Sequence, residues 1–169
     1  MTARIDLNAD LGEGFPWDES LLDLVTSANL CCGAHAGDDE VIVRTLEAAR
    51  ARGVVVGGHP GYPDRSGFGR SPQAMSADQV QSLVVEQVEH LANLARKVGL
   101  EVRYLKPHGA LYNQAQDEPP IAEGLVRAAV RLGLPLLGLD SSLLKKLCGE
   151  RAVPYYLEGF PDRAQTPDG

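Results

Sequence analysis

Three histidines stand in glycine-bounded segments that also carry other ionisable side chains. His35 lies in S-A-N-L-C-C-G-A-H-A-G-D-D, His59 in G-G-H-P-G-Y-P-D-R-S-G-F-G-R, and His108 in K-P-H-G-A-L-Y-N. A lone histidine is more often structural than functional, but three in similar settings beside carboxylates favour one shared site. Imidazoles with carboxylates can bind a divalent metal that activates water, or can act as general base and acid without a metal.

Carboxylates are concentrated close to the start of the chain. Asp6, Asn8 and Asp10 alternate with apolar residues, and Glu13 follows directly. In a β-strand, residues two apart point to the same face, so the three alternating side chains would share one face. The pattern predicts a polar mouth on a sheet or barrel, with a structural hydrogen-bond network as the alternative.

Three cations belong to the same segments as the histidines: Arg65, Arg70 and Lys106. Each could hold a carboxylate or a phosphate, and arginine offers a bidentate fork, although a solvated surface position is the alternative for Arg65. The sequence lacks the G-x-x-x-x-G-K-[ST] loop that binds ATP phosphates, the H-E-x-x-H metal spacing and a nucleophile elbow. A metal is therefore left open, and a covalent acyl-enzyme mechanism has no support.

Short apolar segments predict six strands, and the amphipathic segments between them predict helices. The strands are expected at 4–10, 25–30, 54–57, 102–105, 134–139 and 153–157. Helices are expected at 38–52, 76–98, 119–132, and from Asp140 or Ser141 to about Cys148. This alternation is typical of an α/β protein with a parallel sheet.

Two α/β architectures compete, the open doubly wound sheet and the closed (β/α) barrel. An open dinucleotide-binding sheet would need G-x-G-x-x-G after its first strand, whereas L-G-E-G-F-P-W places Glu13 where a pyrophosphate would lie. In a barrel, functional side chains collect beyond the carboxyl ends of the strands. The polar segments of this sequence follow at least four different strands, so we expect a (β/α) barrel.

Composition excludes several classes of partner. The 16 basic and 23 acidic side chains give a net charge of −7, which argues against binding to nucleic acid or to an anionic membrane. No apolar run approaches the ~20 residues of a membrane span, and early acidic residues exclude a signal peptide. Three cysteines without zinc-type spacing indicate a reduced, cytoplasmic protein.

Four motifs taken together resemble the LamB/YcsF family, from Ile5 to the last residue and in the same order. They are D-L-N-A-D-L-G-E-G, S-A-N-L-C-C-G-A-H-A-G-D, G-G-H-P-G-Y-P-D with G-F-G-R, and K-P-H-G-A-L-Y-N. The resemblance implies a (β/α) barrel related to the sugar deacetylases. It also implies the A subunit of an ATP-dependent 5-oxoprolinase, which opens the lactam 5-oxo-L-proline to L-glutamate together with two further subunits.

The resemblance also implies roles for individual residues. Catalytic roles are expected for Asp10, His35, His59 and His108, and substrate contacts for Asn8, Glu13, Asp64, Arg70, Lys106 and Tyr112. ATP would be handled with the partner subunits, and by analogy with the deacetylases a divalent metal would lie at Asp10, His59 and His108. The alternatives are a stand-alone metal-dependent deacetylase-like hydrolase and a non-catalytic substrate-binding subunit, and a homo-oligomer stays open.

Two features depart from the family pattern. The family's phenylalanine-alanine-aspartate-arginine stretch is F-P-D-R here, from Phe160 to Arg163, and Gln165 stands where an aromatic residue is expected. A barrel of eight β/α units takes about 250 residues, so 169 residues hold between five and six units. We therefore expect residues 1–169 to form one barrel domain that lacks its last one or two β/α units.

Overall fold

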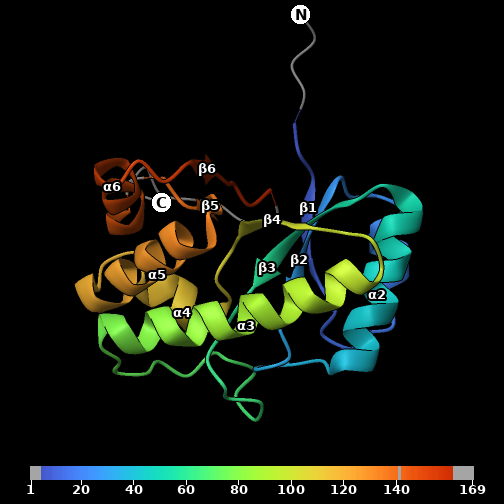
Figure 1. Ribbon diagram of the computed structural model, residues 1–169, viewed down its shortest axis with the longest axis horizontal. Helices are drawn as coiled ribbons and strands as arrows, with labels where there is room; N and C mark the ends of the chain where they lie inside the picture. The colour runs from blue at the N-terminus through green and yellow to red at the C-terminus, as the bar shows by residue number, and fades with distance from the viewer. Residues whose placement is uncertain (1–4, 141, 162–169) are drawn as a thin grey trace, which may run out of the picture.

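One parallel sheet organises the chain. The computed structural model describes residues 5–140 and 142–161. Within them six strands pair in sequence order, each parallel to the next, and Figure 1 shows them curling into a half-barrel. The strands are β1 (Asn8–Leu11), β2 (Ser27–Cys31), β3 (Val55–His59), β4 (Val102–Leu105), β5 (Leu136–Gly138) and β6 (Tyr155–Leu157). An order without reversal is the winding of a barrel, which confirms the expected fold class.

Helices follow the strands and cover one side of the sheet. They are α1 (Asp18–Leu22), α2 (Asp39–Arg52), α3 (Ala77–Lys97), α4 (Gly109–Gln114), α5 (Pro119–Leu132) and α6 (Leu143–Glu150). In turn α2 packs on α3, α3 on α5, and α5 on α6, so these four form a continuous outer layer (Figure 1). The short helices α1 and α4 were not expected from the sequence. No helix of the described residues combines the length and the apolarity needed to cross a membrane.

The ends of the long helices follow from local chemistry. Asp38 accepts a hydrogen bond from the amide of Val41 at 2.9 Å and starts α2, and Ser76 forms a capping box with Gln79 at the start of α3.

Two expectations need correction. The cap of α6 is Ser142 and not the expected Asp140 or Ser141, because the Ser142 Oγ accepts a hydrogen bond from the amide of Lys145 at 3.0 Å.

The other correction concerns the first strand, which begins at Asn8 and not near residue 4. Within residues 5–7, Leu7 makes the backbone bonds to the start of β2. Its amide donates to Thr26 Oγ1 at 2.9 Å, and its carbonyl accepts from the amides of Thr26 at 2.8 Å and Ser27 at 3.2 Å. One residue paired in this way does not continue the ladder. The F-P-D-R stretch that departs from the family pattern is described only in part. Its last two residues, Asp162 and Arg163, and also Gln165, lie outside the described residues.

Apolar and polar side chains occupy opposite faces of the sheet. Ala28 and Leu30 of β2 are fully buried in the apolar core between the sheet and the helices. Ser27 and Asn29, which alternate with them, are also buried but bond to polar groups inside the curl. The apolar core therefore lies between the outer face of the half-barrel and the helices. The interior of the half-barrel contains hydrogen-bonded and charged side chains.

A buried ammonium group joins the first and last strands across this interior. Lys106, directly after β4, lies 3.2 Å from Asp10 Oδ1 on β1 and 3.3 Å from Glu158 Oε2 just beyond β6. A buried cation is costly unless it is paired. Both contacts form only if the sheet curls enough to bring β1 and β6 towards β4.

Close packing of α3 on α5 gives a test of the outer layer. A Cβ on Gly124 of α5 would lie 2.5 Å from Val80 Cβ and 2.6 Å from the carbonyl oxygen of Ala77, both on α3. We expect Gly124→Ala to lower the free energy of unfolding by about 1–3 kcal/mol in urea denaturation. Gly149→Ala in α6 is the control, because it meets no atom within 4 Å and should stabilise slightly. An unchanged Gly124→Ala midpoint would contradict this packing.

Candidate functional site

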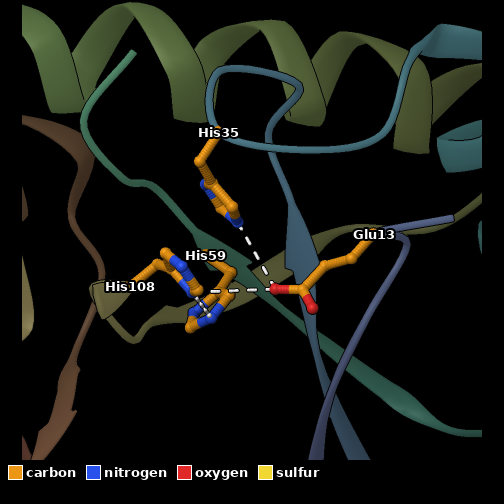
Figure 2. A group of neighbouring side chains, drawn as sticks. All are labelled: Glu13, His35, His59 and His108. Atoms are coloured by element: carbon orange, nitrogen blue, oxygen red, sulfur yellow. Dashed lines mark hydrogen bonds and ion pairs between the residues drawn. The ribbon is translucent and has the colours of Figure 1, made fainter. Parts of the chain in front are cut away.

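Four side chains converge at the carboxyl ends of the first four strands. Glu13, His35, His59 and His108 each present a nitrogen or oxygen atom, and these atoms all lie within 4.8 Å of one another (Figure 2). Glu13 follows β1, His35 follows β2, His59 is the last residue of β3, and His108 precedes α4 after β4. The structure therefore brings together the three histidines that the sequence singled out.

The cluster is compact and largely closed to solvent. His35 and His59 are each 1% exposed and His108 is 6% exposed. The rings of His35 and His108 stack in parallel with centroids 3.8 Å apart. Glu13 Oε1 lies 3.4 Å from His35 Nε2 and 3.6 Å from His108 Nδ1, so one carboxylate oxygen faces two imidazoles (Figure 2).

Two of the imidazoles are hydrogen-bonded to backbone carbonyl oxygens. His59 Nδ1 lies 2.7 Å from the carbonyl oxygen of Lys106, and His108 Nε2 lies 2.8 Å from that of Phe68. The other two nitrogens, His59 Nε2 and His108 Nδ1, face each other at 3.0 Å. Each ring is thereby fixed in orientation, with one nitrogen directed into the cluster.

Burial favours the neutral forms of His108 and His35. It lowers the pKa of His108 to about 4, and the neighbouring His59 and His35 rings act in the same direction. Burial also lowers the pKa of His35, although Glu13 opposes it. Neutral imidazole is the form that ligates metal ions. Near neutral pH His35 and His108 are therefore nitrogen donors in a cluster that also holds the Glu13 side chain.

Asp10 lies beside the cluster and is its most accessible carboxylate. Its side chain is 39% exposed, and Oδ2 lies 3.5 Å from His59 Nε2. Oδ1 accepts a hydrogen bond from Asn29 Nδ2 at 2.7 Å and pairs with Lys106. Partial burial raises the pKa of Asp10, but His59, Lys106 and Asn29 together bring it well below its usual range. Asp10 is thus ionised and points one oxygen towards the mouth.

The alternating residues Asp6, Asn8 and Asp10 were expected to form either a polar mouth or a structural hydrogen-bond network, and the structure contains both. Asp10 lies at the mouth, whereas Asn8 and the exposed Asp6 join a hydrogen-bond network at the amino-terminal end of β1. Ser27 Oγ donates to Asp6 Oδ2 at 2.6 Å, and Asn8 Nδ2 donates to Tyr104 Oη at 2.9 Å. Asn8, predicted to contact substrate, is therefore placed beneath Asp10 and linked to it through Asn29.

The expected anion-holding cations are placed differently from one another. Lys106 already pairs with two carboxylates and is 7% exposed. Arg70 is exposed at the rim, with its Cζ 5.4 Å from the centroid of the Phe68 ring. Arg65 donates to the carbonyls of Gly33 and Gly37, both at 2.8 Å, and so links two loops. Arg65 and Arg70 are both exposed, but Arg65 is engaged by the two loop carbonyls, whereas Arg70 lies over the ring of Phe68 next to His108.

Two further expected residues lie at the edge of the site. Asp64 accepts hydrogen bonds from the amide of Gly67 at 2.8 Å and from Ser66 Oγ at 3.2 Å, which shapes its own loop. Tyr112 is buried on α4, and burial together with the nearby Glu158 charge raises its pKa. Neither side chain belongs to the four-residue cluster.

The cluster that could hold a metal ion overlaps the expected metal ligands only in part. Asp10, His59 and His108 were expected, and the structure adds Glu13 and His35, with Asp10 next to them. Three further residues were not predicted: Asn29, which orients Asp10; Glu158, which pairs with Lys106; and Phe68, whose carbonyl holds His108. The only sequence signal for Asn29 is its polar character within a buried apolar strand.

Comparisons with known proteins agree with this arrangement. The sequence pattern of the LamB/YcsF family matches residues 5–169. The chain belongs to the LamB/YcsF family. A 5-oxoprolinase A subunit from Methylococcus capsulatus is 48% identical over 100% of this chain, which covers 68% of that protein. One from Gluconobacter oxydans is 44% identical over 100% of the chain and 70% of its own length.

Solved structures extend the comparison to the fold. A "lactam utilization protein" from Thermus thermophilus superposes with a TM-score of 0.93 at 37% identity, covering 96% of this chain and 68% of that one. This chain therefore spans about two thirds of the length of the relatives that it matches. The half-barrel of this LamB/YcsF chain thus superposes on about two thirds of that relative.

The lowered pKa of His108 predicts a pH-dependent stability. As pH falls from 6.5 towards 4, the unfolded chain gains a proton that folded His108 does not, so the free energy of unfolding must fall. In the presence of a chelator, we expect the free energy of unfolding of His108→Gln to fall by about 2 kcal/mol less than that of the parent between pH 6.5 and pH 4. Urea denaturation at several pH values measures this. Identical pH slopes for the two proteins would contradict the assignment.

Proposed function

We propose that this chain is a subunit of an ATP-dependent 5-oxoprolinase and that the lactam is opened at its histidine cluster. The observation that carries the proposal is the convergence of three buried imidazoles and two carboxylates at one mouth. Relatives 40–48% identical over nearly the whole chain are named as the A subunit of 5-oxoprolinase. The site contains the groups that hydrolysis of an amide needs.

The chemistry assigns distinct tasks to the enzyme. A lactam is a stable amide, so its opening requires an activated carbonyl and a positioned water molecule. Phosphorylation of the lactam oxygen by ATP would supply the activation. A water oxygen then adds to the activated carbon, and the bond from that carbon to the ring nitrogen breaks as the nitrogen takes up a proton to become the amine of glutamate. A second water hydrolyses the resulting acyl phosphate to the new carboxylate and inorganic phosphate.

Solvent exposure of the side chains distinguishes residues that can contact substrate from buried residues that cannot. Asp10 reaches the mouth with 39% of its side chain exposed, whereas His35 and His59 are almost fully buried. We therefore assign to Asp10 the transfer of a proton from water to the ring nitrogen. Asn29 and Lys106 hold Asp10 Oδ1, which leaves Oδ2 free to face the reacting groups.

The four-residue cluster suits a divalent metal ion. Its donors are three imidazoles and a carboxylate oxygen within 4.8 Å of one another, which are ligands that zinc and similar ions take. Glu13, His35, His59 and His108 would hold the ion, and when bound it would supply a Lewis acid beside Asp10. This donor set is the one that we propose in place of Asp10, His59 and His108.

Binding of the substrate and of ATP follows from charge. Arg70 at the rim is suited to the carboxylate of 5-oxoproline, because Lys106 is already neutralised by Asp10 and Glu158. The chain has no phosphate-binding loop of the G-x-x-x-x-G-K-[ST] kind. We propose that two partner subunits handle ATP and that the assembly works in the cytoplasm, where the free cysteines Cys31, Cys32 and Cys148 stay reduced.

Substitution of the reacting groups tests the proposal. In chain reconstituted with its partner subunits, Asp10→Asn and His59→Ala should each reduce ATP-dependent release of glutamate from 5-oxoproline by about 100-fold or more. Asp23→Asn is the matched control, since Asp23 is an exposed carboxylate that pairs with Arg52 at 2.6 Å. Wild-type rates in both site variants would overturn it, as would glutamate release without ATP or partners.

Metal content is a separate test. We expect protein purified without chelators to hold about one divalent ion per chain, as four converging donors bind one ion. His35→Ala should hold much less, and His90→Ala should equal the parent, because His90 is exposed and pairs with Asp39. Mass spectrometry of the elements measures this. A metal-free parent that remains active with its partners would contradict the metal and leave the acid–base chemistry of Asp10.

A further inference from the structure

The hydrogen bonds behind two of the imidazoles determine where their protons lie. A carbonyl oxygen only accepts hydrogen bonds, so a ring nitrogen at 2.7 or 2.8 Å from it must carry the hydrogen. His59 therefore donates from Nδ1 to the Lys106 carbonyl, and His108 donates from Nε2 to the Phe68 carbonyl. In their neutral forms the two rings are opposite tautomers.

These tautomers leave two lone pairs facing each other. His59 Nε2 and His108 Nδ1 are 3.0 Å apart, and neither carries a hydrogen when its ring is neutral. Asp10 Oδ2 lies 3.5 Å from the first nitrogen and Glu13 Oε1 lies 3.6 Å from the second. The two buried nitrogens therefore flank one point with a carboxylate oxygen near each of them, and a cation at that point, a proton or a metal ion, relieves the repulsion.

The carbonyl that fixes His108 belongs to a residue with unusual backbone geometry. Phe68 has φ of 55°, and among the described residues Ala152 is the other non-glycine with a positive φ. Such a conformation is costly for a bulky residue and persists where its surroundings impose it. Here the conformation lies directly at the candidate site.

The loop around Phe68 is held so that this geometry is imposed. Asp64 bonds the amides of Gly67 and Gly69, the first through its carboxylate and the second through its carbonyl, both at 2.8 Å. The carbonyl of Gly69 accepts from the amide of Ala110 on α4 at 3.0 Å. A Cβ on Gly69 would lie 2.9 Å from both His35 Cβ and His108 Cδ2, so only glycine lets the loop rest on these rings.

We propose that Phe68 is a positioning residue whose left-handed backbone aims its carbonyl at His108 Nε2 and so turns His108 Nδ1 towards the cation point shared with His59 Nε2. The proposal predicts that the cluster uses unlike nitrogens, Nε2 of His59 and Nδ1 of His108. The expected effect of Phe68 on cation binding rests on the function proposed above. The expected tautomers of His59 and His108 are independent of that function.

The tautomers can be observed directly in the metal-free chain. Long-range ¹H–¹⁵N correlation spectra at mildly alkaline pH distinguish a protonated from an unprotonated ring nitrogen in each histidine. We expect the proton of His108 on Nε2 and that of His59 on Nδ1, with His108→Gln and His59→Gln assigning the signals. A His108 ring protonated on Nδ1 would overturn the proposal whatever the activity of the protein.

Two variants of Phe68 separate its backbone from its ring. Phe68→Asn removes the ring but tolerates a positive φ, whereas Phe68→Val places a β-branched residue there and disfavours that conformation. We expect Phe68→Val to weaken Zn²⁺ binding by about 10-fold or more, and Phe68→Asn to stay within a few-fold of the parent. Competition with a chromophoric chelator measures the affinity.

The outcomes are distinct from failure of the proposed function. Urea denaturation in chelator confirms that each variant is folded, and the spectra report His108 in each. Equal loss of the tautomer in both variants would assign the effect to the Phe68 ring and overturn the proposal, as would an unchanged tautomer in Phe68→Val. A parent with the expected tautomers that binds no Zn²⁺ would instead refute the metal site and leave the positioning role in place.

Discussion

The pairing of buried Lys106 with two carboxylates is the constraint on which the rest of the site depends. Its ammonium lies between Asp10 from β1 and Glu158 from beyond β6, so one side chain directly after β4 holds both ends of the sheet. Removing either carboxylate would leave a buried cation underpaired, at a cost of several kcal/mol. This requirement curls the sheet and places Asp10 beside the histidines.

A polar interior is compatible with stability because the apolar core lies elsewhere. The helices bury the outer face of the sheet, and the inner face is satisfied by hydrogen bonds among Asn8, Asn29 and Tyr104. Tyr104 fits only because Gly57 lies beneath it, where a Cβ would come within 2.3 Å of the ring. The interior network is thus closely packed at Tyr104, and Asn29 links it to Asp10 by a hydrogen bond.

Much of this arrangement follows from sequence periodicity, and the remainder depends on geometry that periodicity does not contain. Parallel strands ending at one edge were enough to predict that His35, His59 and His108 meet. The inclusion of Glu13 depends on how the loop after β1 folds back, and that of Glu158 on the curl of the whole sheet. Phe68 acts through its carbonyl, and side-chain type carries no signal for that.

The distribution of charge would also orient the anionic substrate that we propose. Asp10, Glu13 and Glu158 make the floor of the mouth negative, and Lys106 offsets only part of that charge, whereas Arg70 at the rim presents an accessible positive group. On the proposed function, the carboxylate of 5-oxoproline is repelled from the floor and attracted to the rim. The uncharged lactam carbonyl is then the end that enters, which places the bond to be broken beside Asp10.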